Sequence, residues 1–379
     1  MGLIYLDNSA TTKPCELAVN AMQSAMCDTW GNPSSLHRLG VEAENTVSSV
    51  RQKIAGLINC RENEIIFTGS GTEANNLCLI GIAEALKRRG NKIITTSVEH
   101  PSVLNTCKHL SENGFEVTYI KPASNGQISA TDVLDAVDDK TILVSIMLVN
   151  NETGCVFPVS EIAEGLKSLK SRALLHSDCV QAFGKMDIDV DDLGVDLLTA
   201  SGHKIHGPKG IGFLYKKKNI NIKPIIYGGN QEKGLRSGTE SVPLIAALGG
   251  ALDELNVPSS LSLVKRLHNF AVEKLGSMDG VVINSPIKNN LPYIINISVL
   301  GYRSETLLHF LEARDIFVSS GSACSKGKGS HVLNEMGLKA DIIDSALRIS
   351  FSKNTTTDEI DALCVALRDA QNTLRRKGN

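Results

Sequence analysis

The run Ala173-Leu174-Leu175-His176-Ser177, together with Ser201-Gly202-His203-Lys204 further along the chain, decides the fold. The first run is short and apolar, which predicts a buried strand, and Asp178 and Gln181 follow its carboxyl end. Lys204 precedes the glycine-rich residues 206–212, so it lies at the mouth of a loop with a flexible backbone. Open α/β sheets bind their ligands at the carboxyl ends of the strands. The sequence therefore predicts an α/β sheet whose edge brings together an Asp, a Gln and a Lys.

These three side chains are the groups that pyridoxal phosphate needs in a protein. A lysine amine forms a Schiff base with the cofactor, and a carboxylate keeps the pyridine nitrogen protonated so that the ring accepts electrons. The alternative is that Lys204 is a solvated surface charge, as most lysines are. The motifs described below favour a cofactor lysine, so we predict pyridoxal 5'-phosphate as the cofactor.

Composition narrows the class of protein. The 379 residues exceed the usual size of a single core. Because 39 Lys and Arg nearly balance 41 Asp and Glu, we expect no dedicated nucleic-acid surface. The nine cysteines are scattered without a CxxC pair, which indicates a reducing compartment. Residues 1–12 have no basic start and no long apolar run, so we expect no signal peptide, no membrane span and a cytoplasmic protein.

Helical patterns alternate with short β-branched runs, such as 92–96 and 141–146, from about residue 15 to 255. This rhythm predicts a mainly parallel sheet covered by helices. The turn-forming residues Val257-Pro258-Ser259-Ser260 then precede a predicted helix at 261–275, strand-like runs at 280–284 and 292–299, and a capped helix from 358 to about 374. We predict a large domain at 15–257 and a smaller α+β domain made of 1–14 and 258–379.

A turn of small residues, Gly69-Ser70-Gly71-Thr72, separates a predicted strand at 64–68 from a helix that begins near Glu73. Backbone N–H groups at such a turn can cradle a phosphate. The alternative is a turn that only caps the helix.

His100 follows the strand that ends at Thr96, again at the predicted carboxyl edge. An imidazole there can stack on a planar cofactor ring and transfer protons. The alternative is a cap for the helix that Pro101 begins. The chain has no HExxH motif, and His203-x-x-His206 lacks acidic or cysteine companions, so we predict no metal site.

Two further residues point to chemistry. Cys324 lies in a stretch rich in glycine and serine, beside Lys326 and Lys328, which favour the thiolate that attacks sulfur. Arg348 lies in the strand-like run 346–351, on the same face as Ser350. A bidentate guanidinium suits a substrate carboxylate, and the alternative is a structural salt bridge to Asp or Glu.

Taken together, these residues resemble the cysteine desulfurases, which are pyridoxal-phosphate enzymes of the class-V aminotransferase family with fold type I. The resemblance is to the branch that serves nitrogen fixation and iron-sulfur-cluster assembly. It covers nearly the whole chain and runs through ordered motifs at 5–12, 31–37, 69–76, 149–154, 201–204, 236–239 and 319–324.

The resemblance implies a role for each matching residue. Lys204 would be the Schiff-base lysine, His100 the ring-stacking acid and base, Asp178 the partner of the pyridine nitrogen and Gln181 a contact to the phenolic oxygen. The phosphate would be held by Gly71, Thr72, Ser201 and His203, and by Thr239 from the neighbouring subunit, which implies a homodimer. Asn151 and Arg348 would bind the substrate carboxylate, although Asn150 competes with Asn151 for this role.

The implied reaction converts L-cysteine to L-alanine and transfers sulfur to Cys324 as a persulfide. The sulfur would then pass to a protein acceptor, either an iron-sulfur scaffold or a tRNA-thiolating enzyme. The loop after Cys324 is about two residues shorter than in the best-known members of the branch, so the acceptor is not implied. Three alternatives remain: a selenocysteine lyase, an aminotransferase of the same fold and a catalytically silent cofactor-binding partner subunit.

Overall fold

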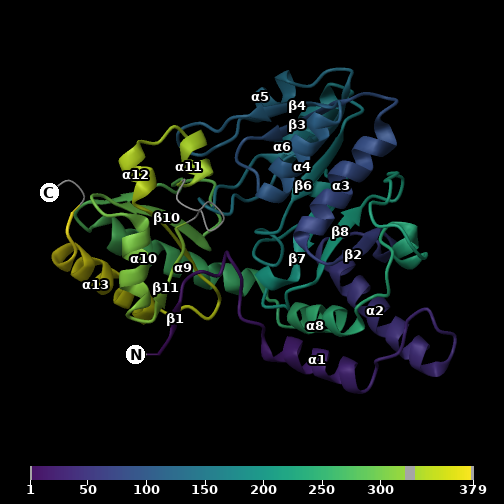
Figure 1. Ribbon diagram of the computed structural model, residues 1–379, viewed down its shortest axis with the longest axis horizontal. Helices are drawn as coiled ribbons and strands as arrows, with labels where there is room; N and C mark the ends of the chain where they lie inside the picture. Colours follow the sequence, from purple (N-terminus) through teal and green to yellow (C-terminus); the bar gives the residue numbers. More distant parts are fainter. Residues whose placement is uncertain (1, 321–328, 377–379) are drawn as a thin grey trace.

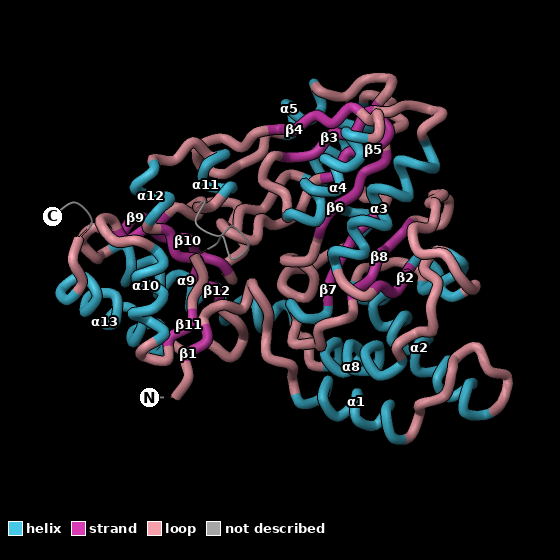
Figure 2. Tube along the Cα trace, viewed as in Figure 1, coloured by secondary structure: helices cyan, strands magenta, loops and turns pink. Residues whose placement is uncertain are grey.

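The computed structural model describes residues 2–320 and 329–376. Two lobes lie side by side (Figure 1), and both contain strands and helices (Figure 2). Within the described residues, the larger lobe is built on seven strands in the order β2-β8-β7-β6-β5-β3-β4. These are β2 (Ile65–Thr68), β3 (Lys92–Thr96), β4 (Glu116–Ile120), β5 (Thr141–Ser145), β6 (Leu174–Asp178), β7 (Leu197–Ser201) and β8 (Gly212–Lys216). Neighbouring strands are parallel except at β8, which runs antiparallel to β2 and β7.

Helices cover both faces of this sheet because successive strand residues point to opposite faces. Ile93 packs with apolar side chains of α3 (Gly71–Leu86) and α4 (Pro101–Glu112). Its neighbour Ile94 belongs to the core that includes residues of α2 (Arg38–Leu57), α6 (Val159–Ser168) and α8 (Val242–Asp253). The remaining helices of this lobe are α1 (Glu16–Cys27), which packs on α8, with α5 (Ala130–Asp135) and α7 (Val190–Leu193). Both faces are therefore buried, as a mainly parallel sheet requires.

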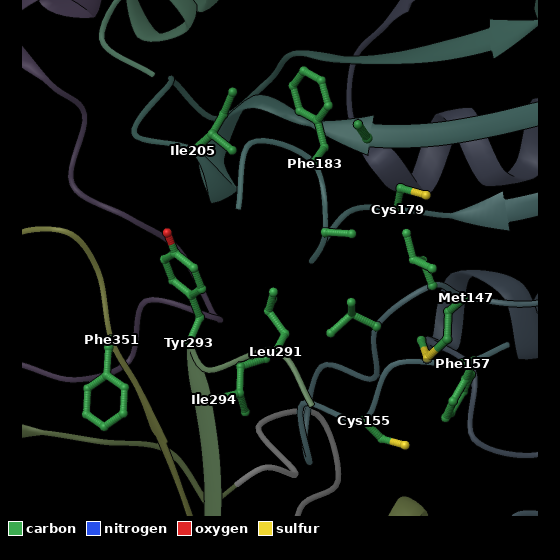
Figure 3. Packing of buried hydrophobic residues seen from close by; sticks show 14 of the residues in the cluster. Met147, Cys155, Phe157, Cys179, Phe183, Ile205, Leu291, Tyr293, Ile294 and Phe351 are labelled. Carbon is green, nitrogen blue, oxygen red and sulfur yellow. The ribbon is translucent and has the colours of Figure 1, made fainter. Parts of the chain in front are cut away.

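The smaller lobe contains an antiparallel sheet in the order β12-β10-β9. Its strands are β9 (Val281–Ile283), β10 (Ile294–Val299) and β12 (Ala346–Ser350). The helices around it are α9 (Val257–Gly276), α10 (Ser304–Glu312), α11 (His331–Glu335), α12 (Ala340–Asp344) and α13 (Thr357–Thr373). Apolar contacts continue between the lobes, since Met147 and Phe157 belong to the same core as Leu291 and Ile294 (Figure 3).

Residues 4–12 connect the two lobes. β1 (Ile4–Tyr5) pairs in parallel with β11 (Ile316–Phe317) of the smaller lobe, and Asn8 donates to the backbone oxygen of Ser350. A few residues on, the backbone N–H of Thr12 donates to the oxygen of His203 in the larger lobe. The chain then continues to α1 beneath the large sheet (Figure 1).

The predicted α/β fold with a mainly parallel sheet is confirmed. β3 occupies the predicted residues, and α13 carries the predicted cap, a capping box between Thr356 and Glu359. The turn predicted at 257–260 is wrong, because these residues form the first turn of α9, with Asn256 as its N-cap. Proline fits the first turn of a helix, where its missing N–H has no partner to lose. The division into domains at 257/258 stays a prediction.

Candidate active site

Lys204 ends a short 3-10 turn (Gly202–Lys204) that follows β7 directly. The backbone N–H of Gly202 donates to Ile211, and the N–H of Gly207 donates to Gly202, so the glycine-rich segment folds back on the turn. The Lys204 amine is largely buried and donates to the backbone oxygens of Ser9 at 2.6 Å and Ala10 at 2.7 Å. The pKa of Lys204 is lowered to about 8, because burial and the charge of Arg348 outweigh the opposing effects of Asp7 and Asp178.

Asp178 is the last residue of β6 and is buried. Its Oδ2 accepts from the side-chain amide of Asn75 at 2.7 Å, and its Oδ1 accepts from the N–H of Val180 at 2.9 Å. Gln181 lies one turn further, where its Nε2 donates to the Ser9 oxygen at 3.0 Å. The Ser9 oxygen therefore accepts from both Gln181 and Lys204, which brings the predicted Asp, Gln and Lys side chains to one region.

His100 caps α4, so its capping role is observed. Its Nδ1 accepts from the N–H of Ser102 at 3.1 Å and lies 2.8 Å from the Ser102 hydroxyl. The same hydroxyl accepts from Asn75 at 2.9 Å, and Asn75 also binds Asp178. Burial lowers the pKa of His100, the charge of Asp178 opposes this shift, and Lys204 and His331 add to it. A hydrogen-bonded chain therefore runs from Asp178 through Asn75 and Ser102 to Nδ1 of the imidazole and orients the ring.

The turn Gly69-Ser70-Gly71-Thr72 opens α3 as predicted, and the Ser70 hydroxyl caps the helix by accepting from Glu73. A Cβ at Gly71 would lie 2.7 Å from a methyl of Val180, so only glycine fits there. Thr72 is exposed and lines a groove of about 360 Å³ together with His100. The capping role is therefore observed, and the phosphate cradle stays a prediction.

Two more predicted phosphate ligands lie at the end of β7. The Ser201 hydroxyl is buried without a hydrogen-bond partner among the described residues. Nδ1 of His203 lies 3.2 Å from the hydroxyl of Thr11, and burial lowers the pKa of His203 to about 4, so it is neutral near pH 7. Thr239 is exposed, in a loop that the Arg236–Glu73 ion pair ties to the start of α3 at 2.8 Å.

Arg348 makes the structural salt bridge that was left open as an alternative. Its Nη2 lies 2.8 Å from Asp7, and its Nη1 donates to the backbone oxygen of Asn151 at 3.0 Å. Its Nε is buried and has no partner among the described residues. Asn150 is fully used by the fold, since its side chain bonds Val98, Glu152 and Thr153. Of Asn150 and Asn151, Asn151 is therefore the one whose side-chain amide is available to a ligand.

Cys324 lies outside the described residues. Ser330, just after this segment, donates to Glu152, and His331 Nδ1 lies 3.9 Å from the same carboxylate. Burial raises the pKa of Glu152 to about 7, although Ser330 and Arg348 oppose the shift.

Sequence reasoning missed several residues of this region. Asn75, Ser102 and Thr199 form hydrogen bonds around Asp178, and Thr199 donates to Asn75 at 2.6 Å. Asn75 lies within the 69–76 motif, which was a usable signal. Ser9 and Ala10 contact Lys204 through backbone oxygens, so their residue types give no indication of this role.

Comparisons with known proteins identify the family. The model of the class-V aminotransferases matches residues 4–363. The cysteine desulfurase IscS of Methanosarcina thermophila is 38% identical over 98% of this chain and 93% of its own length. A solved structure described as a NifS-like protein superposes with a TM-score of 0.93 at 35% identity, covering 98% of this chain and 100% of that one. The structure of SspA in complex with cysteine has a TM-score of 0.83 at 35% identity, over 93% and 99% of the two chains.

The chain belongs to the cysteine desulfurases of the class-V aminotransferase family. The predicted fold type and family are confirmed, and pyridoxal phosphate is the cofactor of this family. The site of this desulfurase fits that group chemically. It offers a buried amine on Lys204, a buried carboxylate on Asp178 and an unpaired buried hydroxyl on Ser201 near the start of α3.

No group of three or more His, Cys, Asp and Glu side chains suited to a metal ion lies within residues 2–320 and 329–376. None of the helices in the same ranges is long and apolar enough to cross a membrane.

Proposed function

We propose that this chain is a pyridoxal-phosphate-dependent cysteine desulfurase that converts L-cysteine to L-alanine and transfers the sulfur to Cys324. The observation that carries the proposal is the buried Lys204 amine, with its pKa lowered to about 8, beside Asp178 and His100. The neutral amine is the form that acts as a nucleophile and a base, and a lysine with a pKa of about 8 presents far more of it at physiological pH than an ordinary surface lysine does.

Each residue of the site has a distinct task. When bound, pyridoxal phosphate supplies an electron sink for the bonds at Cα of the amino acid. Lys204 would hold the cofactor through its amine and would also be the base that takes the Cα proton. Asp178, held by Asn75 and Val180, keeps a proton on the ring nitrogen. His100, whose Nδ1 is occupied by Ser102, transfers protons through Nε2.

Separate residues would bind the phosphate and the substrate carboxylate. Gly71, Thr72, Ser201 and His203 would hold the phosphate, with the start of α3 contributing backbone N–H groups. Arg348 and Asn151 bind the carboxylate. The unpaired Nε of Arg348 supports this role, because it gives the guanidinium a donor that the protein itself does not use.

The sulfur step uses Cys324. Its thiolate attacks the sulfur of the bound cysteine, an S–S bond forms as the C–S bond breaks, and the electron pair of that bond passes to the carbon side, where protons complete alanine. The persulfide sulfur then goes to a protein acceptor, an iron-sulfur scaffold or a tRNA-thiolating enzyme. The Lys326 and Lys328 charges in the sequence favour the thiolate.

The functional unit in this proposal is a cytoplasmic homodimer. Thr239 is exposed, which suits a residue that reaches the phosphate of the neighbouring subunit. The eight cysteines among the described residues are all free, which supports a reducing compartment.

The test measures alanine and sulfide together after L-cysteine and a reductant are added to the purified protein. We expect a yellow protein that forms both products in equal amounts. Lys204→Ala should lose the visible absorption and turnover, whereas Cys324→Ala should keep the colour and form no persulfide. Cys27→Ala, which changes an exposed free cysteine, serves as the matched control and should behave like the wild type.

Three results would contradict the proposal. A protein that cannot be loaded with the cofactor would refute the role of Lys204. Wild-type sulfide release by Cys324→Ala would refute the role of the thiol. A loaded protein that acts only on selenocysteine, or on neither amino acid, would point to a lyase or to a silent partner subunit.

A further inference from the structure

Lys185 is a buried lysine that the proposed reaction does not use. Its side chain is 5% exposed and its amine donates to Oε1 of Gln181 at 3.0 Å. The amine also lies 5.7 Å from the centre of the Tyr293 ring. Burial, together with the charges of Lys204 and Arg348, lowers its pKa to about 7. Burying a lysine is energetically costly. The small number of polar contacts that Lys185 makes therefore needs an explanation.

The backbone is shaped to bring this side chain inside. Gly184 has a positive φ of 71°, and a Cβ there would lie 2.8 Å from a methyl of Ile205, so a larger residue would push the segment away. The ring of Tyr293 lies beside Leu291 in the same apolar region (Figure 3). Lys185 and Lys204 line one small cavity of about 30 Å³ together with Tyr293. The Lys185 side chain is therefore directed toward Gln181 and the site around Lys204.

The contact with Gln181 has a directional consequence. A glutamine amide presents an acceptor on one side and donors on the other, and its neighbours decide which side faces where. Lys185 in its protonated form can only donate, and the Ser9 oxygen can only accept, so the carbonyl of Gln181 faces Lys185 and the NH₂ group faces Ser9. That NH₂ group donates to the Ser9 oxygen, which also accepts from Lys204. With the amide reversed, NH₂ would meet the amine of Lys185 and the carbonyl would meet the carbonyl of Ser9.

We propose that Lys185 is a positioning residue that acts through Gln181, holding its amide so that the N–H donors, and not the carbonyl, face Lys204 and the cofactor's phenolic oxygen. This inference rests on the proposed function, because it needs pyridoxal phosphate at Lys204. A donor at the phenolic oxygen stabilises its ionised form, which sets the colour of the bound cofactor. Lys185 thereby tunes the cofactor without touching it.

The test compares the visible absorption maximum and the dissociation constant for pyridoxal phosphate in the full-length protein. Lys185→Met removes the donor at similar length, Lys185→Arg keeps a donor, and Gln181→Leu removes the amide. We expect Lys185→Met to shift the absorption maximum in the same direction as Gln181→Leu. The double variant should match Gln181→Leu alone, since residues that act through one another are not additive. Lys185→Arg should restore the wild-type maximum.

A purely structural lysine would lower the urea midpoint of unfolding and leave the absorption maximum unchanged. That result, or additive shifts in the double variant, would overturn the inference. If Lys185→Met does not fold, Lys185→Leu, which also removes the donor, carries the same expectation. A wild type that does not bind pyridoxal phosphate would instead refute the proposed function, so the two failures are distinguishable.

Discussion

At Lys204, burial and the nearby carboxylates act in opposite directions. Burial and Arg348 favour the neutral amine, whereas Asp7 and Asp178 favour the protonated one, which also donates to the backbone oxygens of Ser9 and Ala10. The balance lowers the pKa to about 8, where proton loss becomes easy near neutral pH. The amine is therefore held in place while protonated and becomes reactive when it loses its proton.

This balance predicts how the rate of cofactor capture depends on pH. Only the neutral amine attacks the aldehyde, so the rate for the cofactor-free protein should rise about tenfold per pH unit below pH 8 and level off above it. Stopped-flow absorbance after mixing with pyridoxal phosphate measures this rate. A rise that continues to pH 10, as for an ordinary lysine, would show that burial does not lower the pKa of Lys204.

Among the elements, the junction between β8 and the start of α3 depends most on small residues. A Cβ at Gly212 in β8 would lie 2.7 Å from the oxygen of Ala200 and 2.8 Å from the carbonyl carbon of Ser70. The antiparallel strand β8 therefore comes close enough to support the Ser70-Gly71 turn from the side. The one antiparallel strand of the described sheet thus lies beside the proposed phosphate cradle.

Gly212→Ala should disturb this junction. We expect a loss of about 1–3 kcal/mol in the free energy of unfolding, because the extra methyl meets backbone that cannot move aside. Weaker binding of pyridoxal phosphate should accompany it, since the turn would shift.

Gly56→Ala is the matched control, because a Cβ at that position in α2 meets nothing within 4 Å. This control should gain about 0.5–1 kcal/mol, as replacing a helix glycine by alanine does. Urea unfolding measures the change in stability, and cofactor titration measures the change in affinity. Equal results for Gly212→Ala and Gly56→Ala would contradict the proposed role of the junction.

The elements show what the sequence could and could not predict. Short β-branched runs located the strands, and the small-residue turn located the start of α3, because both signals are local. The start of α9 was misjudged because proline and serine favour turns and first helical turns alike. The network of Asn75, Ser102 and Thr199 joins residues far apart in the chain, and no local pattern encodes such pairings. For Arg348 the residue type could not distinguish a substrate carboxylate from Asp7.

At the scale of the whole molecule, the proposed homodimer should share its active sites. Each site would take Lys204 from one subunit and Thr239 from the other. Lys204→Ala and Thr239→Ala should each lose activity, the first by loss of cofactor attachment and the second by weaker phosphate binding. A heterodimer of the two variants would still contain one intact site.

Mixing the two variants in equal amounts, with unfolding and refolding together, should therefore restore about a quarter of the wild-type activity, because half of the dimers are mixed and each has one intact site of two. Measuring alanine formation after refolding each variant alone supplies the control. If the mixture is no more active than the separately refolded variants, each active site takes both Thr239 and Lys204 from the same subunit.

The link formed by residues 4–12 has a consequence for synthesis on the ribosome. The strand partner of β1 lies at Ile316–Phe317, and Asn8 binds Ser350. These partners are translated long after β7 and Lys204, so the large sheet can fold while the early segment still waits for them. Gln181 and His203 can hold part of this segment earlier, but the oxygens of Ser9 and Ala10 gain all of their restraints only once residue 350 has emerged. We therefore expect the chain to bind the cofactor only near the end of its synthesis.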